Sequence, residues 1–437
     1  MRHWKTLSTS FATLCARISS VVGLMIINGV AKRHMTDDQF GLWAVLYAIN
    51  LFTNGLDFGF RFTLGNRLAA LGSRGVEAEE ERRETFLSIV YLQVAIAAVL
   101  MLLTLLIFPL LPWAHWFKIT DPLLTAQVRR LMPVVMVIML GTLPVALMWT
   151  VFFAYQEIKL ASFLTGIVTI FQTALFVFSV YRFKFTWVIL IFFCSNIFVS
   201  FLLTAYVFIR RRWKVTLLPL SRILATTRSM ERIAFPAFLF GQSSTLQMIL
   251  GPIVSGAISG LPAAGDFSLF QKLFSPLITA HLAMLAPLSP AVTMEAHAGN
   301  WDAVRRRLRV CVLQIWPAVF IGLGFLVWAA HPVLLRLWAG SWLRQYPLAA
   351  LLLVWACLNG FVNTFAVFLN SLGLVKMQAA VSIAMVLPSV LLPVLLHYWF
   401  KAPGIAIALS LILCMVPGAI IWPLYTRQAL RLQKLRV

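Results

Sequence analysis

The stretch "WVILIFFCSNIFVSFLLTAYVFIRRRWK" (residues 187–214) decides the fold class of this sequence. Its first part, residues 187–209, is almost wholly apolar, and the basic run "RRRWK" (210–214) follows directly. A helix of about 20 apolar residues crosses roughly 30 Å of hydrocarbon. Clustered arginine at one end of such a run is typical of its cytoplasmic end. We therefore predict a transmembrane helix at 187–209.

The rest of the chain repeats this pattern. Hydrophobic residues make up 61% of the 437 residues and charged residues only 11%, with a mean hydropathy of +0.89. Such a composition excludes a water-soluble globular protein. We predict an all-α, polytopic membrane protein with twelve transmembrane helices. The predicted spans are 11–30, 40–58, 85–108, 131–155, 161–181, 187–209, 235–258, 267–292, 310–330, 347–370, 378–398 and 403–425.

The basic residues predict the orientation. Most of the 36 lysines and arginines fall in connections on the same side as the N-terminus. The positive-inside rule then places both termini in the cytoplasm, and we expect a multi-pass protein of the bacterial inner membrane. A net charge of +22 would suggest nucleic acid in a soluble protein. Here "RRRWK" and "RRRLR" (305–309) lie just beyond span ends, where anionic headgroups explain them, so no nucleic-acid partner is predicted.

Metal and cofactor chemistry find no support in the residue spacing. The five cysteines stand singly in apolar spans, and the seven histidines form no paired motif. The cysteines are Cys15, Cys194, Cys311, Cys357 and Cys414. We predict no metal, no cofactor and no catalytic residues, and interpret the cysteines as packing residues.

An internal repeat divides the chain into two halves. "IINGVAKRHMTDDQFGLWAVL" (26–46) aligns without gaps to "IVSGAISGLPAAGDFSLFQKL" (253–273), with Gly29 on Gly256. Each half then holds six spans, and an even number makes the repeats parallel. The predicted domains are an N-terminal six-helix lobe (1–209), a basic cytoplasmic linker (210–234), a C-terminal six-helix lobe (235–425) and a basic cytoplasmic tail (426–437).

A stripe of polar and aromatic residues runs along one face of the second span. Its residues recur at the helical spacing of three or four: Trp43, Tyr47, Asn50, Asn54, Asp57 and Arg61. Lipid does not solvate such a stripe, so it must line a bundle interior or a water-filled cavity. A structural interpretation stays open, in which Asp57 and Arg61 form a local salt bridge and the asparagines only bond neighbouring helices.

Two cations lie inside predicted spans, Arg17 in the first and Lys272 in the eighth. Each costs about 2.5–3.5 kcal/mol at a helix centre on insertion scales unless it is paired or solvated. Either an anionic ligand explains them, or the long side chains reach the nearest interface. The predicted substrate-binding residues are Arg17, Asn28, Asn50, Asn54, Asp57, Arg61, Gln242, Gln247 and Lys272.

Five fragments, in order along the whole chain, resemble one family. They are "DDQFGLWAVL" (37–46), "GLDFGFRFTLGNRLA" (55–69), "PLSPAVTMEAHAGNWDAVRRRL" (287–308), "LLRLWAG" (334–340) and "FLNSLGLVKMQ" (368–378). The chain is similar to the polysaccharide (O-antigen type) flippases of the multidrug/oligosaccharidyl-lipid/polysaccharide exporter superfamily.

The resemblance implies two six-helix lobes that alternate access to a central cationic cavity. It also implies export of undecaprenyl-pyrophosphate-linked sugar repeat units to the periplasmic leaflet, for O-antigen, capsule or exopolysaccharide synthesis. The cavity would hold the cations and amides named above, with Asp57 and Arg61 at its inner rim. A polysaccharide polymerase and a chain-length regulator are candidate partners. This sequence departs from the family in how few carboxylates lie in its spans, so it offers few groups for proton or sodium coupling.

Three alternatives remain. A multidrug or cation antiporter of the same superfamily would need a buried carboxylate. A major-facilitator transporter also has six plus six spans, but its compact acidic and basic loop signature is missing. A membrane glycosyltransferase or polymerase would use "TDDQ" (36–39) as outer catalytic acids. We interpret Asp37 and Asp38 instead as helix-start residues and predict a non-enzyme.

Overall fold

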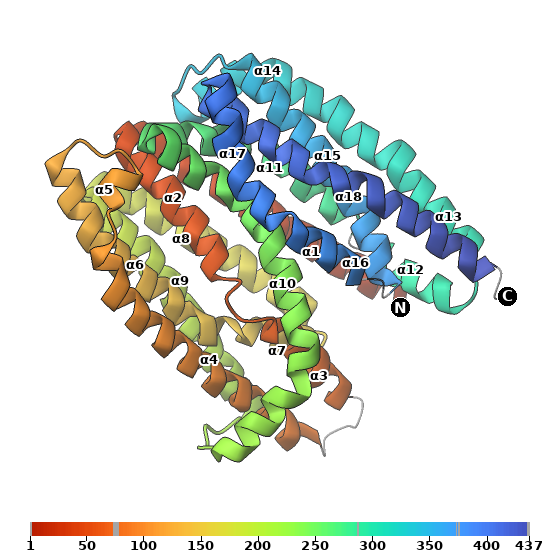
Figure 1. Ribbon diagram of the computed structural model, residues 1–437. Helices are drawn as coiled ribbons and strands as arrows, with labels where there is room; N and C mark the ends of the chain where they lie inside the picture. Colours follow the sequence, from red (N-terminus) through yellow and green to blue (C-terminus); the bar gives the residue numbers. More distant parts are fainter. Residues whose placement is uncertain (1, 73–77, 286–287, 373, 375, 435–437) are drawn as a thin grey trace. The chain divides into compact units, whose positions relative to one another are not determined.

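The computed structural model describes residues 2–72, 78–285, 288–372, 374 and 376–434. These residues are almost wholly helical, and no strand occurs among them, which confirms the all-α prediction. The chain forms two compact units (Figure 1). The first unit comprises Met1–Ile27 and Leu46–Thr245, and the second comprises Asn28–Val45 and Leu246–Val437. Helices α1, α2 and α10 therefore each contribute residues to both units.

The helices of the first half are α1 (Arg2–His34), α2 (Asp37–Thr53), α3 (Phe60–Gly72), α4 (Glu79–Ile107), α5 (Trp113–Trp116), α6 (Pro122–Ala146), α7 (Met148–Ala154), α8 (Ile158–Arg182) and α9 (Phe185–Arg211). Those of the second half are α10 (Leu220–Ser259), α11 (Leu261–Leu285), α12 (Leu288–His297), α13 (Trp301–Val310), α14 (Gly324–Ala339), α15 (Tyr346–Ser371), α16 (Lys376–Ala384), α17 (Val386–Phe400) and α18 (Pro403–Lys434). A 3₁₀ turn, η2 (Phe108–Leu110), and two π-helical turns, η3 (Cys311–Ile315) and η4 (Ala318–Leu323), complete the set.

Nine helices of the described residues are long and apolar enough to cross a membrane. Every predicted span overlaps one or more of the described helices. The three spans beyond those nine correspond to α2, α10 and α11. Helix α2 has only 17 residues, and α11 carries Asp266 and Lys272 in its first half. The count of twelve and the cytoplasmic termini stay predictions.

The second span ends earlier than predicted. Helix α2 stops at Thr53, residues 54–59 form a turn, and α3 starts at Phe60. Gly59 has a φ of +75°, and a Cβ there would collide with the carbonyl oxygen of Ala234. Only glycine meets both conditions without strain. The prediction of one continuous helical stripe as far as Arg61 is therefore wrong beyond Thr53.

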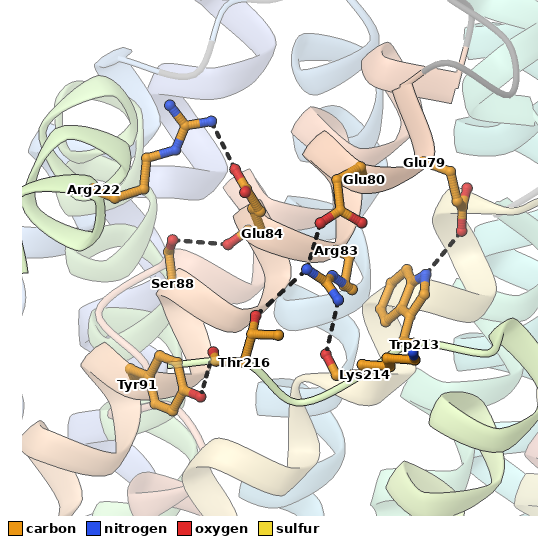
Figure 2. A network of polar contacts seen from close by, with 10 residues as sticks. All are labelled: Glu79, Glu80, Arg83, Glu84, Ser88, Tyr91, Trp213, Lys214, Thr216 and Arg222. Carbon is orange, nitrogen blue, oxygen red and sulfur yellow. Dashed lines mark hydrogen bonds and ion pairs between the residues drawn. The ribbon is translucent and has the colours of Figure 1, made fainter. Parts of the chain in front are cut away.

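The segment predicted as a linker, 210–234, is part of the first unit. Figure 2 shows residues 213–222 beside the first turns of α4. The Trp213 indole donates to Glu79 Oε1 at 2.9 Å, and the Tyr91 hydroxyl donates to the Thr216 carbonyl at 2.9 Å. Residues of this basic segment therefore form specific hydrogen bonds with α4.

Helix α10 begins within the same segment. Arg222 Nη2 lies 2.8 Å from Glu84 Oε2. Further along α10, Met230 and Ala234 are buried in the hydrophobic core of the first unit with Leu64 of α3. Residues 220–234 are therefore part of a 40-residue helix. The lobe boundaries at 209 and 235 stay predictions.

The predicted tail is helical as far as Lys434. Leu430 is 6% exposed and packs in a buried cluster with Val304 and Cys311. This contact explains why α18 continues beyond the predicted span. Residues 435–437 lie outside the described residues.

Helix α2 begins at Asp37, which confirms Asp37 and Asp38 as helix-start residues. The cap itself is Thr36. The Gln39 backbone N–H donates to Thr36 Oγ1 at 3.3 Å, and the Thr36 N–H donates to Gln39 Oε1 at 3.3 Å. This reciprocal pair is a capping box, which satisfies two backbone donors at the helix start.

A bidentate ion pair joins helices α12 and α13. The Arg307 guanidinium donates from Nη2 to Glu295 Oε1 at 2.7 Å and from Nε to Oε2 at 2.9 Å. These bonds hold the pKa of Glu295 below its usual value. A carboxylate with a lowered folded-state pKa stabilises the fold above its unfolded pKa, about 4.3, and loses that contribution as pH falls through the folded value.

We therefore expect acid to destabilise the wild type more than the Glu295→Gln variant. Thermal unfolding of the purified chain in detergent at pH 7 and at pH 3.5 is the measurement. The variant is expected to be less stable at pH 7 and to approach the wild type at the lower pH. A stability difference independent of pH would contradict this assignment.

Candidate transport site

Three side chains of the second unit meet on one amide oxygen. Asn28 of α1 is fully buried. Lys272 of α11 donates from Nζ to Asn28 Oδ1 at 2.6 Å, and the Trp43 indole of α2 donates to the same oxygen at 3.2 Å. The two lone pairs of the oxygen are thus both used. Asn28 therefore fixes the position of the Lys272 ammonium group.

Close helix packing builds this site. Gly41 of α2 lies so near the start of α11 that a Cβ there would collide with the Leu261 carbonyl. A Cβ on Gly265 would lie 2.7 Å from the Phe40 ring. The absence of side chains at both glycines lets α2 and α11 approach along their first turns. This approach holds Trp43 and Lys272 within reach of Asn28.

The charge of the site depends on the side chain that the Lys272 ammonium contacts. An asparagine side chain carries no charge, so Asn28 orients the ammonium without neutralising it. Burial strengthens such a charge-assisted hydrogen bond relative to water. The arrangement suits a phosphate or carboxylate group brought in by a ligand.

A second ionic cluster lies in the same unit. Lys32 Nζ is 2.6 Å from Asp37 Oδ1 and 3.3 Å from Asp266 Oδ1, and the Lys32 side chain is 9% exposed. These residues line a pocket of about 400 Å³ with Arg33 and Gly340. Sequence reasoning missed this cluster because it assigned Lys32 and Asp37 to a connection. The repeat alignment held the signal, since it put the turn at 36–39 opposite Asp266.

Four predicted site residues meet in the first unit, around the turn that follows α2. Arg61 Nε lies 3.4 Å from Asp57 Oδ2, so the two residues do pair. Asp57 Oδ1 also accepts the Gly59 backbone N–H at 3.0 Å. Arg61 Nη2 donates to the Asn54 carbonyl at 3.3 Å. Asp57 and Arg61 thus stabilise the turn.

Gln242 of α10 has a similar local role. Its Nε2 donates to the Phe52 carbonyl at 3.1 Å, and the same carbonyl accepts the Gly55 backbone N–H at 3.0 Å. Gln93 of α4 donates to the Asp57 carbonyl at 2.8 Å. These side-chain donors add to the backbone bonds of the turn and tie it to α10 and α4.

The remaining predicted residues are placed as follows. Arg17 and Asn50 are half-buried side chains of the first unit. The Gln247 side chain lies outside the described residues. The structure therefore groups Asn28 with Lys272 in one unit, and Asn54, Asp57, Arg61 and Gln242 in the other. Their contact with a substrate stays a prediction.

Comparison with known proteins gives a match at the level of structure. Neither a protein-family model nor a curated protein matches the sequence. The inward-facing conformation of a multidrug resistance MATE family transporter of the MOP superfamily is similar, with a TM-score of 0.74 and 11% identity, over 97% of this chain and 99% of that one. The chain has the MATE fold.

Two further solved structures share this fold. The eukaryotic MATE transporter AtDTX14 is 16% identical, with a TM-score of 0.68 over 100% of this chain and 99% of that one. A MOP superfamily transporter from Pyrococcus furiosus is 13% identical, with a TM-score of 0.61 over 98% and 97% of the two chains. In that transporter, a reverse polarity of the binding pocket suggests a different function. The MATE fold accounts for an all-helical membrane protein, while function must be argued from the site.

Proposed function

We propose that this MATE-fold protein is a transporter of lipid-linked oligosaccharide, which moves undecaprenyl-pyrophosphate-linked repeat units from the cytoplasmic to the periplasmic leaflet of a bacterial inner membrane. The product would serve the synthesis of a surface polysaccharide. The protein breaks no bond, because its role is to bind and release the pyrophosphate and sugars on opposite sides.

The observation that carries this proposal is the Lys272 ammonium, which the neutral Asn28 amide holds on α11, a helix predicted to span the membrane. A pyrophosphate is too polar to cross hydrocarbon alone, and a positioned cation offsets part of that cost. The polyprenyl tail needs no polar partner and stays in lipid. Arg17 supplies a second half-buried cation on α1.

A multidrug or cation antiporter is the second candidate, favoured by the similarity in fold to a multidrug resistance transporter. Exchange of a cationic drug against protons or sodium calls for a carboxylate in the bundle. Asp57 is the one acidic residue in the predicted spans. It is engaged with Arg61 and the Gly59 backbone, which leaves it poorly placed for exchange.

Reconstitution of the purified full chain in vesicles tests the proposal. A polyprenyl-pyrophosphate disaccharide with a fluorescent sugar reports leaflet exchange, because dithionite added outside quenches only the outer leaflet. We expect quenching beyond the outer-leaflet fraction in protein-containing vesicles and only the outer-leaflet fraction in protein-free ones. The same vesicles loaded with ethidium measure cation transport. Ethidium transport without lipid exchange would replace this function with the antiporter.

A further inference from the structure

A second basic site lies in the second unit, away from Lys272. It is a pocket of about 590 Å³ lined by residues of α13, η3, α15 and α18. Arg305 and Arg309 project from α13, and Arg427 and Arg431 project from α18. Members of each pair are four residues apart, so each pair lies on one face of its helix. The pocket thus gathers four guanidinium groups from two helices.

The charges in this pocket are poorly balanced. Arg305 Nη1 lies 3.3 Å from Asp302 Oδ1, but the Asp302 side chain is 89% exposed. Among the residues that the structure describes, no carboxylate lies within ion-pair distance of Arg309, Arg427 or Arg431. Water screens an exposed pair such as Arg305 and Asp302 strongly. The pocket therefore attracts anions.

The wall of the pocket is apolar. Leu308, Val312 and Leu313 contribute to it from α13 and η3, and Phe365 and Pro423 from α15 and α18. Arg305 Nη2 also donates to the Leu430 carbonyl at 3.0 Å, which ties α13 to α18. The site thus offers several cationic donors above a hydrocarbon surface. A free phosphate ion would use only the first of these features, whereas an anionic lipid uses both.

Its position relative to the membrane agrees with a lipid ligand. Arg309 immediately precedes the predicted span 310–330, and Arg427 follows closely on the predicted span 403–425. The four guanidinium groups are therefore expected at the level of the cytoplasmic headgroups. Basic pockets between transmembrane helices on this side suit phosphate-bearing lipids.

We propose that this arginine pocket binds the headgroup of an anionic membrane phospholipid. The planar guanidinium groups donate paired hydrogen bonds to phosphate oxygens, and the acyl chains lie along the apolar wall. The site is separate from Lys272 and does not depend on which substrate is transported.

Native mass spectrometry of the full chain in mild detergent tests this inference, with tetraoleoyl cardiolipin and dioleoyl phosphatidylcholine as probes. We expect cardiolipin to bind at least about tenfold more tightly than phosphatidylcholine, and Arg427→Gln/Arg431→Gln to lose at least about tenfold of that affinity. Arg427→Lys/Arg431→Lys keeps the positive charge but loses the planar guanidinium groups that donate paired hydrogen bonds, so it should retain part of the affinity. This second variant keeps the test valid if the glutamine variant folds poorly.

Arg228→Gln/Arg232→Gln is the matched control. These two arginines are also four apart, exposed and on a segment predicted to be cytoplasmic. An equal loss of cardiolipin in this control would indicate unspecific attraction and overturn the proposal. Unchanged binding in the α18 variants would overturn it as well. Binding of a polyprenyl pyrophosphate but not of cardiolipin would assign the pocket to the transported lipid instead.

Discussion

Replacing Lys272 by methionine is expected to reduce lipid-linked oligosaccharide exchange by about 10- to 100-fold. Methionine fills a similar volume but removes the ammonium group. A hydrogen bond to a charged group is worth about 1.5–3 kcal/mol, and every 1.4 kcal/mol corresponds to a factor of ten. The vesicle assay with the fluorescent disaccharide measures the change at matched protein amounts.

Two companion variants separate charge from packing. Lys272→Arg retains a cation and should keep a larger share of activity than Lys272→Met. Asn28→Asp places a carboxylate where Asn28 Oδ1 now lies 2.6 Å from Lys272 Nζ, so it neutralises the ammonium while preserving its bond. We expect Asn28→Asp to lose exchange although it folds. Full activity of Lys272→Met would refute the cationic site.

Gly41→Leu is expected to prevent accumulation of folded protein. Even the first added carbon would collide with the backbone carbonyl of Leu261, and a backbone group inside a packed unit has little room to move. Overpacking in a core typically costs 1–3 kcal/mol, and a rigid neighbour raises the cost, so a loss on the order of 3 kcal/mol or more is expected. Size-exclusion chromatography after a heating series measures it.

Gly166→Ala in α8 is the control for this variant. A Cβ at Gly166 would meet no atom within 4 Å, and alanine favours a helix interior over glycine by about 0.5–1 kcal/mol. The control should accumulate normally and resist heat at least as well as the wild type. Equal behaviour of the two variants would mean that the approach of α2 to α11 does not limit stability.

The helices were the most predictable part of the structure. Runs such as residues 187–209 show their length and polarity directly, because hydrocarbon imposes a minimum length on a crossing helix. Helix ends were harder to predict. The turn that follows Thr53 brings Gly59 against Ala234, which is far away in sequence. Residues 220–234 look like a basic connection until Met230 and Ala234 are seen in a core.

The sequence predicted which polar residues belong to the candidate site, but not which of them contact one another. Polarity within apolar spans marked Asn28 and Lys272, and their separate helices gave no sign that one oxygen would join them to Trp43. Helical spacing correctly paired Asp57 with Arg61. The contacts support the structural interpretation of a local salt bridge, because both residues stabilise the turn. Helical spacing did not show where the helix stops, since a turn interrupts the periodicity on which that prediction rests.

The anchoring of residues 213–222 on α4 has a consequence for synthesis. A nascent chain released only as far as Arg211 would contain all of α3 to α9, yet Glu79 would lack the Trp213 indole and Tyr91 would lack the Thr216 carbonyl. The hydrophobic core around Leu64 would also lack Met230 and Ala234. The first six spans therefore complete their packing only after the ribosome has begun the second half.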